Sequence, residues 1–501
     1  MSSPDFYPHP VENIHVVQTH ISWVVLTGSY AYKIKKPLDL GFLNFTTLDL
    51  RRHYCEEELR LNQVFAPELY LEVVPIYEHD SHYSLQNSAN LAPIEYAVKM
   101  KQFDDHDLLR NIFDRDEFTP DLAVTLGKHI AAIHIAAPGG KTLASFGDIT
   151  NLRQTASENF QVAQKFIGRA LSQEAYDRMQ SYIDHFLEIH EHLLLRRKKK
   201  GCIRECHGDL HLGNICLYNG KPELFDRIEF NDAYKNIDVI YDLAFLIMDL
   251  EFRDRPDLAN RVLNTYLEQT GDYEGAALLP LYLIFRAQIR AKVACILSED
   301  PEVSSNSRIE ALDEASRYFE YAYQHAHAAR GRLIIMTGVS GSGKSTIASR
   351  IAIELNAVHI RSDAVRKHLA GAALNQQDIN IYTHEWDEKT YDELLRLGMI
   401  LAKEGLPVIL DAKYDRQQRR HTIEEAAHQA KLPLVLVQCR AAAAVLRDRL
   451  IQRKGDVSDA TPELLDAQLA SYESLDYIEK RMAIIVHEET PINEIIKKLT
   501  P

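Results

Sequence analysis

One nine-residue segment constrains the fold of this chain more than any other. Residues 338–346 read GVSGSGKST, which fits the pattern G-x4-G-K-S/T, and they lie between an apolar strand pattern and a helical pattern. In such a loop the backbone N–H groups face a polyphosphate, and the N-terminus of the helix adds positive charge. A flexible Gly/Ser turn is the alternative, but both flanks fit the first interpretation. The segment therefore predicts a strand, a phosphate-binding loop and a helix.

The same loop predicts which residues hold a nucleotide. Lys344 is expected to reach the outer phosphates, and the Ser345 hydroxyl is a candidate ligand for Mg²⁺. The residues expected to surround the phosphates are Gly338, Ser340, Gly341, Ser342, Gly343, Lys344, Ser345 and Thr346. The expected ligands are therefore a nucleotide and Mg²⁺.

Around this loop, strand and helix patterns alternate to the end of the chain. Five short apolar runs are separated by stretches long enough for helices, which is typical of a parallel sheet with helices on both faces. The runs are 332–337, 358–362, 407–411, 433–439 and 483–488. Just before them, residues 309–330 carry apolar groups at helical spacing. We therefore expect two domains, 1–328 and 329–501.

Three polar residues follow the strands next to the loop. Parallel sheets of this kind carry their sites at the carboxyl ends of strands, where Asp363 and Asp411 lie. Asp363 could accept a proton from an attacking hydroxyl, and Arg366 could hold an anionic acceptor or balance charge on the moving phosphoryl group. Asp411 could orient Mg²⁺ through water. For each aspartate a helix N-cap is the alternative.

A basic cluster lies further along the chain, at Arg447, Arg449, Arg453 and Lys454. Basic groups on a mobile segment can close over phosphates and exclude water, and Arg447 and Arg453 are the candidates for this role. A solvated helix face is the alternative.

These features together resemble small P-loop kinases of the gluconate-kinase-like, zeta-toxin-like and polynucleotide-kinase-like group. The resemblance rests on the loop, the words SDAVRKHLAG (362–371) and GLPVILDA, the tract from Tyr382 through Tyr391, and the arginine cluster. It covers about residues 331–501. It implies phosphoryl transfer from ATP to a small or oligomeric acceptor.

The densest stretch of the first domain runs from residue 202 to residue 230. The pair Asn219-Gly220 lies between two strand-like runs and predicts a β-hairpin, which would bring Asp226 back beside Asn214. An amide oxygen and a carboxylate suit Mg²⁺. Asp209, on the loop that leads to Asn214, could accept a proton from a substrate hydroxyl.

Upstream, two strands are expected about the Gly28-Ser29 turn, and Lys33 lies in the second. A lysine there can neutralise nucleotide phosphates, and a carboxylate of the following helix can hold it. Glu57 is the chosen partner, with Glu56 and Glu58 left open. The alternative for Lys33 is a solvated strand end.

These residues resemble the aminoglycoside phosphotransferase and choline-kinase-like branch of the protein-kinase fold. The matching residues are H-G-D-x4-N at 207–214, Asp226, Asp242 in YDLAFL and A-x-K ending at Lys33, and no G-x-G-x-x-G precedes that lysine. The resemblance covers about residues 20–325. It implies ATP-dependent phosphorylation of a small-molecule hydroxyl, with Asp209 as base, Asn214 and Asp226 as Mg²⁺ ligands, and Asp242 supporting the loop.

The fold class expected from both resemblances is a protein-kinase-like bilobal α+β domain followed by a parallel-sheet α/β domain with a P-loop. The expected function is ATP-dependent phosphoryl transfer to hydroxyl groups of small-molecule acceptors. The rival is an N-terminal pseudokinase or ligand-binding domain that regulates a C-terminal P-loop ATPase or kinase.

Charge bears on the partners. The net charge is −15 over 501 residues, and almost all of it lies before residue 331. An acidic surface repels nucleic acid and anionic lipid, so neither is an expected partner of the first domain, while nucleic acid stays open for the second. On charge alone the first site would favour a neutral or cationic acceptor and the second an anionic one.

Cysteine use and apolar runs bear on the location of the protein. Six cysteines are scattered along the chain, which predicts reduced thiols, and the Cys/His spacing in 202–216 matches no common zinc pattern. The basic run 196–200 is interpreted as a helix end. Without a long apolar run or an N-terminal signal, a cytoplasmic location is expected.

Overall fold

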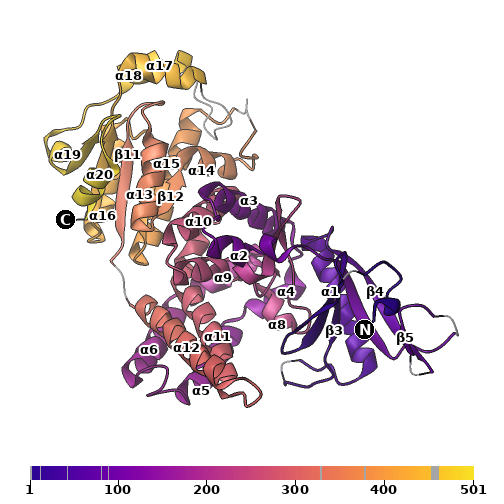
Figure 1. The fold of residues 1–501 in the computed structure, drawn as a ribbon. Helices are drawn as coiled ribbons and strands as arrows, with labels where there is room; N and C mark the ends of the chain where they lie inside the picture. The colour runs from indigo at the N-terminus through magenta and orange to yellow at the C-terminus, as the bar shows by residue number, and fades with distance from the viewer. Residues whose placement is uncertain are drawn as a thin grey trace. The chain divides into compact units, whose positions relative to one another are not determined.

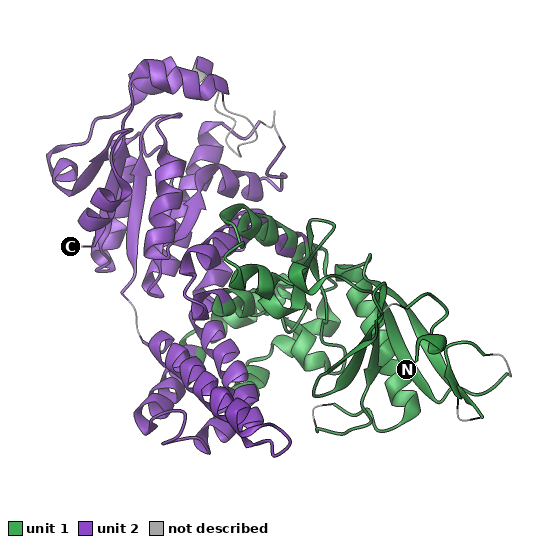
Figure 2. Cartoon of the chain, viewed as in Figure 1, with its two compact units in different colours: residues 1–129, 133–158, 187–249 green, residues 130–132, 159–186, 250–501 purple. Residues whose placement is uncertain are grey.

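The computed structural model describes residues 3–11, 13–41, 43–80, 82–87, 90–327, 330–376, 380–452 and 462–500. The chain divides into two compact units, which Figure 2 colours separately. Unit 1 comprises Met1–His129, Ile133–Glu158 and Leu187–Asp249. Unit 2 comprises Ile130–Ala132, Asn159–Phe186 and Leu250–Pro501. Each unit therefore combines stretches that are distant in the sequence.

Unit 1 begins with an antiparallel sheet whose strands follow the order β1-β2-β3-β6-β4-β5. The strands are β1 His15–Gln18, β2 Ser22–Leu26, β3 Tyr30–Lys35, β4 Tyr70–His79, β5 His82–Ser84 and β6 Glu95–Lys101. Helix α1 (Leu48–Phe65) lies beside this sheet (Figure 1). It starts where Thr47 Oγ1 accepts a hydrogen bond from the Leu50 N–H, which satisfies a free donor of the first turn.

The remainder of unit 1 is mostly helical and carries two short strand pairs, β7 with β10 and β8 with β9. These strands are β7 Ile203–Glu205, β8 Ile215–Tyr218, β9 Lys221–Leu224 and β10 Asn236–Asp238. The α-helices that lie mostly in this unit are α2 Leu109–Asp114, α3 Pro120–Ala136, α4 Lys141–Ala144, α5 Ile149–Gln164, α7 Glu191–Lys200, α8 Asp232–Lys235 and α9 Val239–Phe252. Its 3-10 turns are η1 Pro4–Phe6, η2 Asp105–Asp107, η3 Ser145–Gly147 and η4 Leu212–Asn214.

Unit 2 contains a helical part and a sheet. The helical part consists of α6 Gln173–Ile189, α10 Pro256–Thr270, η5 Tyr273–Leu278, α11 Leu279–Glu299 and α12 Ser305–His325. Helix α10 lies against the edge strand of the sheet, because the Asn264 side chain donates to the Ala357 carbonyl at 2.9 Å and accepts from the His359 N–H at 2.7 Å. The helical part and the sheet are thus joined by partly buried polar contacts.

The sheet of unit 2 is parallel, with the strand order β12-β13-β11-β14-β15. Its strands are β11 Arg332–Thr337, β12 Val358–Arg361, β13 Pro407–Asp411, β14 Leu434–Cys439 and β15 Ala483–Val486. The surrounding helices are α13 Lys344–Leu355, α14 Ser362–Leu369, α15 His384–Lys403, α16 Gln417–Gln429, α17 Ala443–Gln452, η6 Pro462–Leu464, α18 Leu465–Ser471, α19 Tyr477–Met482 and α20 Ile492–Leu499.

Alternating side chains of the central strand β11 pack on opposite faces of this sheet. Ile334 and Met336 belong to a core that includes residues of α13 and α20. Leu333 faces α15, where a Cβ at Gly398 would lie 3.2 Å from it. Helices therefore cover both faces, as strands buried on two sides require.

The predicted fold class is confirmed: a kinase-like N-terminal part precedes a parallel-sheet domain with a P-loop. The five apolar runs of the second domain all form strands, within about two residues of the expected ends. The predicted domain boundary between residues 328 and 329 lies outside the described residues.

Two further observations concern the whole chain. Among the described residues, every helix falls short of the length and apolar character needed to cross a bilayer. The six cysteines all lie among the described residues; none forms a disulfide, and five are buried.

Candidate active sites

The first candidate site is built on the loop between β7 and β8 in unit 1. Asn214 donates from its side-chain amide to the backbone oxygen of Asp209 at 2.9 Å and to its carboxylate at 3.0 Å. Asn214 is buried, whereas 37% of the Asp209 side chain is exposed. The amide therefore fixes the orientation of a carboxylate that a ligand can still reach.

A tight hairpin brings the next candidate residues to this loop. Asn219 and Gly220 both have positive φ, 52° and 74°, as a type I′ turn requires, and β8 and β9 pair in register around them. The Phe225 N–H then donates to the Asn214 carbonyl at 3.0 Å. Asp226 follows directly, so the hairpin brings Asn214 and Asp226 to the same end, as expected.

Lys33 of β3 reaches Asp226 across unit 1. Its Nζ forms an ion pair with the Asp226 carboxylate and lies 2.8 Å from Glu58 of α1. Burial alone would lower the pKa of Lys33, but Asp226 and Glu58 raise it well above its ordinary value, so the ammonium stays charged. Asp226 itself has a φ of +60°, and its N–H donates to the Tyr70 hydroxyl at 3.0 Å.

The choice of Glu57 as the partner of Lys33 was wrong. Glu57 pairs with Arg60 at 2.8 Å, one turn along the same helix, whereas the α1 carboxylate that pairs with Lys33 is that of Glu58. Glu58, one residue on, lies about 100° further round the helix and is fully buried. It belongs to the buried stripe that also contains Cys55 and Leu61, and this spacing is the signal that identifies it.

A second buried lysine of β3 was not predicted. Lys35 donates to the other oxygen of Glu58 at 2.7 Å and forms an ion pair with Glu229. Both Lys35 and Glu229 are at most 5% exposed. Glu58 is thereby held by two lysines, and these contacts keep its pKa below the ordinary value although burial would raise it.

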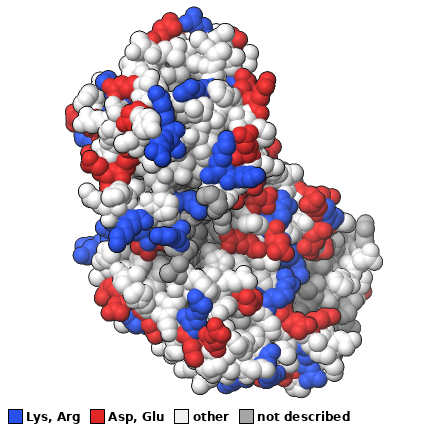
Figure 3. All heavy atoms as spheres, turned by 90° about the vertical axis from the view of Figure 1, so that its left-hand side faces the viewer, with Lys and Arg blue, Asp and Glu red and all other residues white. Residues whose placement is uncertain are grey.

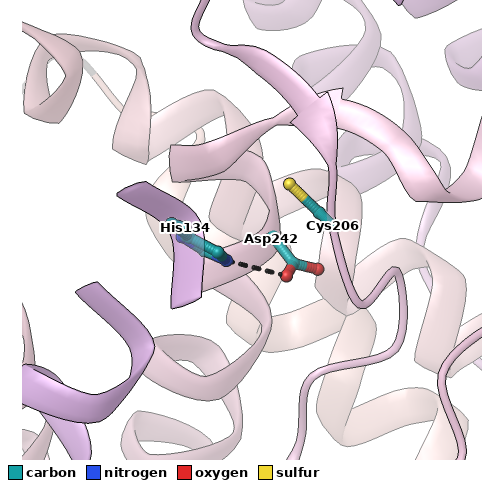
Figure 4. Close-up of side chains that lie close together, drawn as sticks. All are labelled: His134, Cys206 and Asp242. Carbon is teal, nitrogen blue, oxygen red and sulfur yellow. Dashed lines mark hydrogen bonds and ion pairs between the residues drawn. The ribbon is translucent and has the colours of Figure 1, made fainter. Parts of the chain in front are cut away.

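Asp242 holds the backbone of the Asp209 loop in place through hydrogen bonds. Its carboxylate accepts hydrogen bonds from the N–H groups of His207, at 3.0 Å, and Gly208, at 2.8 Å. Figure 4 shows His134 pointing at the same carboxylate, 3.1 Å away, with Cys206 beside it. The side chains of His134, Cys206 and Asp242 bring atoms that could bind a metal within 4.8 Å of one another. The Asp242 carboxylate already accepts three hydrogen bonds, and the Cys206 thiol donates to the Ile237 carbonyl. We therefore interpret the group as structural support for the loop rather than as a metal site.

Loop 338–346, between β11 and α13, forms the second candidate site, in unit 2. Gly338, Gly341 and Gly343 all have positive φ. A Cβ at Gly341 would lie 2.9 Å from the Leu446 carbonyl, so no larger residue fits there. The Ser342 hydroxyl is buried without a hydrogen-bond partner, and Lys344 donates to the Val339 carbonyl at 2.9 Å. This cradle of glycines, with an unpartnered hydroxyl and a lysine turned back onto the loop, fits a polyphosphate.

A cavity of about 460 Å³ opens beside this loop. Its wall combines residues of the loop with polar and aromatic residues from the ends of β12 and β13 and from α14, α15 and α18. Those outside the loop are Arg361, Ser362, Asp363, Arg366, Tyr382, Asp387, Tyr391, Asp411, Ala412, Lys413, Asp415, Ala467, Gln468 and Ser471. The cavity is therefore large enough for more than the phosphates alone.

Asp411 ends β13 and faces the loop. It is 4% exposed and hydrogen-bonds to His359 of β12 at 3.0 Å. Burial alone would raise its pKa, but the contacts with His359, Lys344 and Ser345 lower it to about 2. Asp411 is thus an ionised carboxylate beside the Ser345 hydroxyl, and this oxygen pair suits Mg²⁺. The sequence did not predict His359.

Asp363 and Arg366 lie on α14 and both line the cavity. Arg361 is the N-cap position of that helix, and Arg416 is that of the helix after Asp411, so neither aspartate is an N-cap. Arg366 is 4% exposed and donates to the Ile381 carbonyl at 3.1 Å.

The arginine cluster differs from the expectation. Arg447 forms an exposed ion pair with Asp466 and is not among the residues that line the cavity. Arg449 is the cation beside the loop, 3.5 Å from the Gly341 carbonyl. The reason is helical geometry, because Arg449 shares the face of Leu446 that packs on the loop, whereas Arg447 does not. Arg453 lies outside the described residues.

Surface charge gives no sign of a single extended basic patch on the face that Figure 3 presents, where basic and acidic side chains lie interspersed among the described residues. This face therefore lacks the continuous positive stripe typical of nucleic-acid binding.

Comparison with known proteins agrees with the two sites. The model of the phosphotransferase enzyme family matches residues 49–279, and the model of an AAA domain matches residues 333–475. Two solved structures match this chain with low TM-scores. A sugar kinase from Janibacter has 25% identity over 34% of this chain and 92% of its own, with a TM-score of 0.27. A choline/ethanolamine kinase family protein from Mesorhizobium loti has 11% identity over 63% and 92%, with a TM-score of 0.37.

One similar protein spans both domains. An uncharacterized protein of Mycobacterium tuberculosis is 31% identical over 470 residues, which is 92% of this chain and 91% of the mycobacterial protein. The chain therefore belongs to the family of that mycobacterial protein, and it joins a domain that the phosphotransferase enzyme family model matches to a P-loop domain that the AAA domain model matches.

Proposed function

We propose that this chain is an ATP-dependent phosphotransferase with two kinase-like sites, each of which transfers the γ-phosphoryl group of ATP to a hydroxyl group of a small molecule. The observation that supports this most is the convergence of Asp209, Asn214 and Asp226 at the open end of one hairpin, with Lys33 paired to Asp226. A base, two oxygen ligands and a lysine are the groups that phosphoryl transfer requires.

In the N-terminal site, Asp209 accepts the proton of the attacking hydroxyl, and the Asn214 amide keeps its carboxylate in place. The oxygens of Asn214 and Asp226 would hold Mg²⁺, and Lys33, steadied by Glu58, would bind the phosphates. When bound, Mg²⁺ neutralises charge on the triphosphate.

In the C-terminal site, the N–H groups of residues 338–346 and Lys344 would bind the phosphates, and Ser345 with Asp411 would hold Mg²⁺. Asp363 is the candidate base because it lines the same cavity as Lys344. Arg366 would orient the acceptor. The role proposed for Arg447 passes to Arg449, which lies beside the loop.

The setting proposed for this activity is the cytoplasm, with small molecules as acceptors. Six free thiols, five of them buried, are compatible with a reducing compartment.

Two single variants of the full chain test the proposal. ATP labelled in the γ position is incubated with a pool of metabolites, and the labelled products are separated. Asp209→Ala should abolish one set of products and Lys344→Ala another, because each change removes one site. Glu57→Gln, in a partly exposed ion pair of α1, serves as the control and should retain both sets. If both variants yield every product of the parent chain, the proposal is wrong.

A second candidate function is favoured by one observation. The turn between β2 and β3 is short, since the Thr27 N–H donates to the Tyr30 carbonyl at 2.9 Å, and it leaves little backbone to cover phosphates. The N-terminal part would then bind a ligand and regulate the C-terminal site without turnover. Under that function Asp209→Ala would remove no product but would change the rate of the C-terminal reaction.

A further inference from the structure

We propose that the acceptor site in the C-terminal cavity selects a neutral polyhydroxylated compound, of the sugar or polyol class, over an anionic one. The proposal rests on the proposed phosphotransferase function of this domain and adds the class of its acceptor. It reverses the acceptor charge expected from the sequence, where the arginines alone favoured an anion. The structure supplies the counter-charges that the sequence does not reveal.

Arg366 is the cation most deeply placed in the cavity wall, and its charge is already neutralised. Its guanidinium lies 2.8 Å from the Asp387 carboxylate of α15. Arg366 is 4% exposed and the Asp387 side chain 29%, so this ion pair is partly buried and salt screens it less than a fully exposed pair. An anion next to Arg366 would meet Asp387 at almost the same distance, and attraction and repulsion would largely cancel.

The other two cations on the acceptor side are also paired. Arg361 lies 3.4 Å from Glu268, which belongs to helix α10 rather than to the parallel-sheet domain. Lys413 lies 3.9 Å from Asp415, two residues along the chain. Each cation on this side therefore lies near a carboxylate. Asp387 and Asp415 are shared with Arg419, at 3.6 and 3.8 Å, and Arg419 has a further partner in Glu388 at 3.1 Å.

The charge of the whole cavity wall agrees with this pairing. Its cations are Lys344, Arg361, Arg366 and Lys413, and its carboxylates are Asp363, Asp387, Asp411 and Asp415. These charges balance, and Lys344 belongs to the phosphate-binding loop. Once ATP occupies that loop, a second anion would have to enter a cavity without excess positive charge, which is unfavourable at low dielectric constant. A neutral acceptor avoids this cost.

The wall also has hydrogen-bonding capacity of both kinds. The Nε of Arg366, a donor, and Oδ1 of Asp415, an acceptor, are buried without a hydrogen-bond partner, and both residues line the cavity. A hydroxyl group can donate and accept, whereas a carboxylate or phosphate oxygen only accepts. Tyr391 adds an aromatic ring to the same wall, with its centre 5.1 Å from that of Tyr414 and the Arg419 guanidinium 3.9 Å over it. Neighbouring hydroxyls on an apolar carbon frame complement this combination.

Binding to matched compounds tests the proposal. The full chain carrying Asp209→Ala is saturated with Mg²⁺ and a non-hydrolysable ATP analogue, and acceptors are titrated by calorimetry or ligand-observed NMR. The pairs are sorbitol with gluconate, ribitol with ribonate, and glucose with glucuronate, which differ in one carboxylate. We expect at least one neutral member to bind, and to bind about tenfold more tightly than its anionic partner. Equal or tighter binding of the anions, or no binding of any neutral member at millimolar concentration, overturns the proposal.

Two variants test the cause of the preference. Asp387→Asn releases the charge of Arg366, and Glu268→Gln releases that of Arg361; each should raise the affinity for the anionic member relative to the neutral one about tenfold. Glu385→Gln, in an exposed pair of α15 with Lys389, is the control and should change nothing. An unchanged preference in both test variants contradicts the proposal.

The experiments distinguish a failure of the proposed acceptor preference from a failure of the proposed phosphoryl transfer. Neutral compounds that bind but are never phosphorylated by the chain with ATP would contradict phosphoryl transfer and leave the preference standing. Phosphorylation of the anionic members alone, abolished by Lys344→Ala, would support phosphoryl transfer and contradict the preference.

Discussion

Lys35 donates a hydrogen bond to the Glu58 carboxylate at 2.7 Å, so the carboxylate that binds Lys33 through its other oxygen is shared by two buried lysines. Lys35 also pairs with Glu229, three residues after Asp226. Helix α1 is therefore linked to the segment that carries Asp226 through two lysines of β3 rather than one. The cluster holds three carboxylates against two ammonium groups, and the remaining negative charge favours a bound cation.

Replacement of Lys35 by methionine tests this fastening. The variant leaves Glu229 and one oxygen of Glu58 buried without a partner, so the free energy of unfolding should fall by about 3–5 kcal/mol. Urea unfolding followed by the fluorescence of Trp23, in β2, measures the loss. N-terminal products should also decrease, since Glu58 is free to leave Lys33.

Glu57→Gln is the matched control for Lys35→Met. Its ion pair with Arg60 is partly exposed, with 26% of the Glu57 side chain and 54% of the Arg60 side chain accessible, so stability should change by less than about 1 kcal/mol. A Lys35→Met chain as stable as the parent would show that Lys35 does not hold the cluster together.

Patterns of neighbouring residues in the sequence were sufficient to predict part of the first site. The Asn219-Gly220 turn predicted the hairpin, because both positions need positive φ and the two arms pair from there without a gap. The partner of Lys33 was missed for a physical reason. Glu57 and Glu58 are adjacent in the sequence, and only the direction in which the helix buries its side chains separates them.

A change of pH tests the environment of Asp411. The folded-state pKa of about 2 lies below the ordinary value near 3.9, so the ionised carboxylate stabilises the fold. This contribution, about 2 kcal/mol, is present above pH 4 and is lost as the pH falls from about 4 to about 2. Asp411→Asn should therefore be about 2 kcal/mol less stable than the parent at pH 6, and the difference should vanish near pH 2. Urea unfolding followed by Trp386, in α15, gives both values.

Asp466→Asn provides the comparison for this experiment. Its ion pair with Arg447 is exposed, so its stability difference from the parent should be small at every pH. A difference for Asp411→Asn that stays constant between pH 6 and pH 2 would falsify the assignment of a low pKa.

In the second site, too, the sequence predicts the local elements but not the contacts between distant segments. The loop 338–346 and its flanking strands follow from runs of neighbouring residues, and the sequence predicted them. His359 meets Asp411, and Glu268 meets Arg361, only because β12 pairs with β13 and α10 packs on β12. No pattern in one stretch of sequence contains these contacts. The carboxylate partner of Arg361 could therefore not be identified from the sequence alone.

Gly208→Ala tests the support of the Asp209 loop. Gly208 has a φ of +88°, and a Cβ there would lie 2.8 Å from the Tyr234 carbonyl, so the loop must shift. We expect N-terminal products to fall more than about 100-fold, because small displacements of a catalytic carboxylate are costly. The control is Gly220→Ala, where φ is also positive but the space is open. It should lose about 1 kcal/mol of stability and little activity. Equal activity in the two variants would contradict the prediction.

Asn264→Ala tests whether α10 helps to hold the C-terminal site. The change leaves the His359 N–H without its side-chain acceptor, and an unsatisfied polar group of this kind costs about 1–3 kcal/mol. The Ala357 carbonyl loses one of its two donors and keeps the other, Asn260 at 3.0 Å. His359 would then be less fixed against Asp411, so the Mg²⁺ concentration for half-maximal C-terminal activity should rise, with the maximal rate less affected.

The control is Asn306→Ala on the exposed surface of α12, which should alter neither the stability nor the Mg²⁺ dependence. Titration of Mg²⁺ in the labelled-ATP assay separates the two effects of Asn264→Ala. If stability falls and the Mg²⁺ dependence does not move, α10 contributes to the fold alone. If the Mg²⁺ requirement rises in step with the loss of stability, a helix within the stretch matched by the phosphotransferase family sets the metal affinity of the P-loop site.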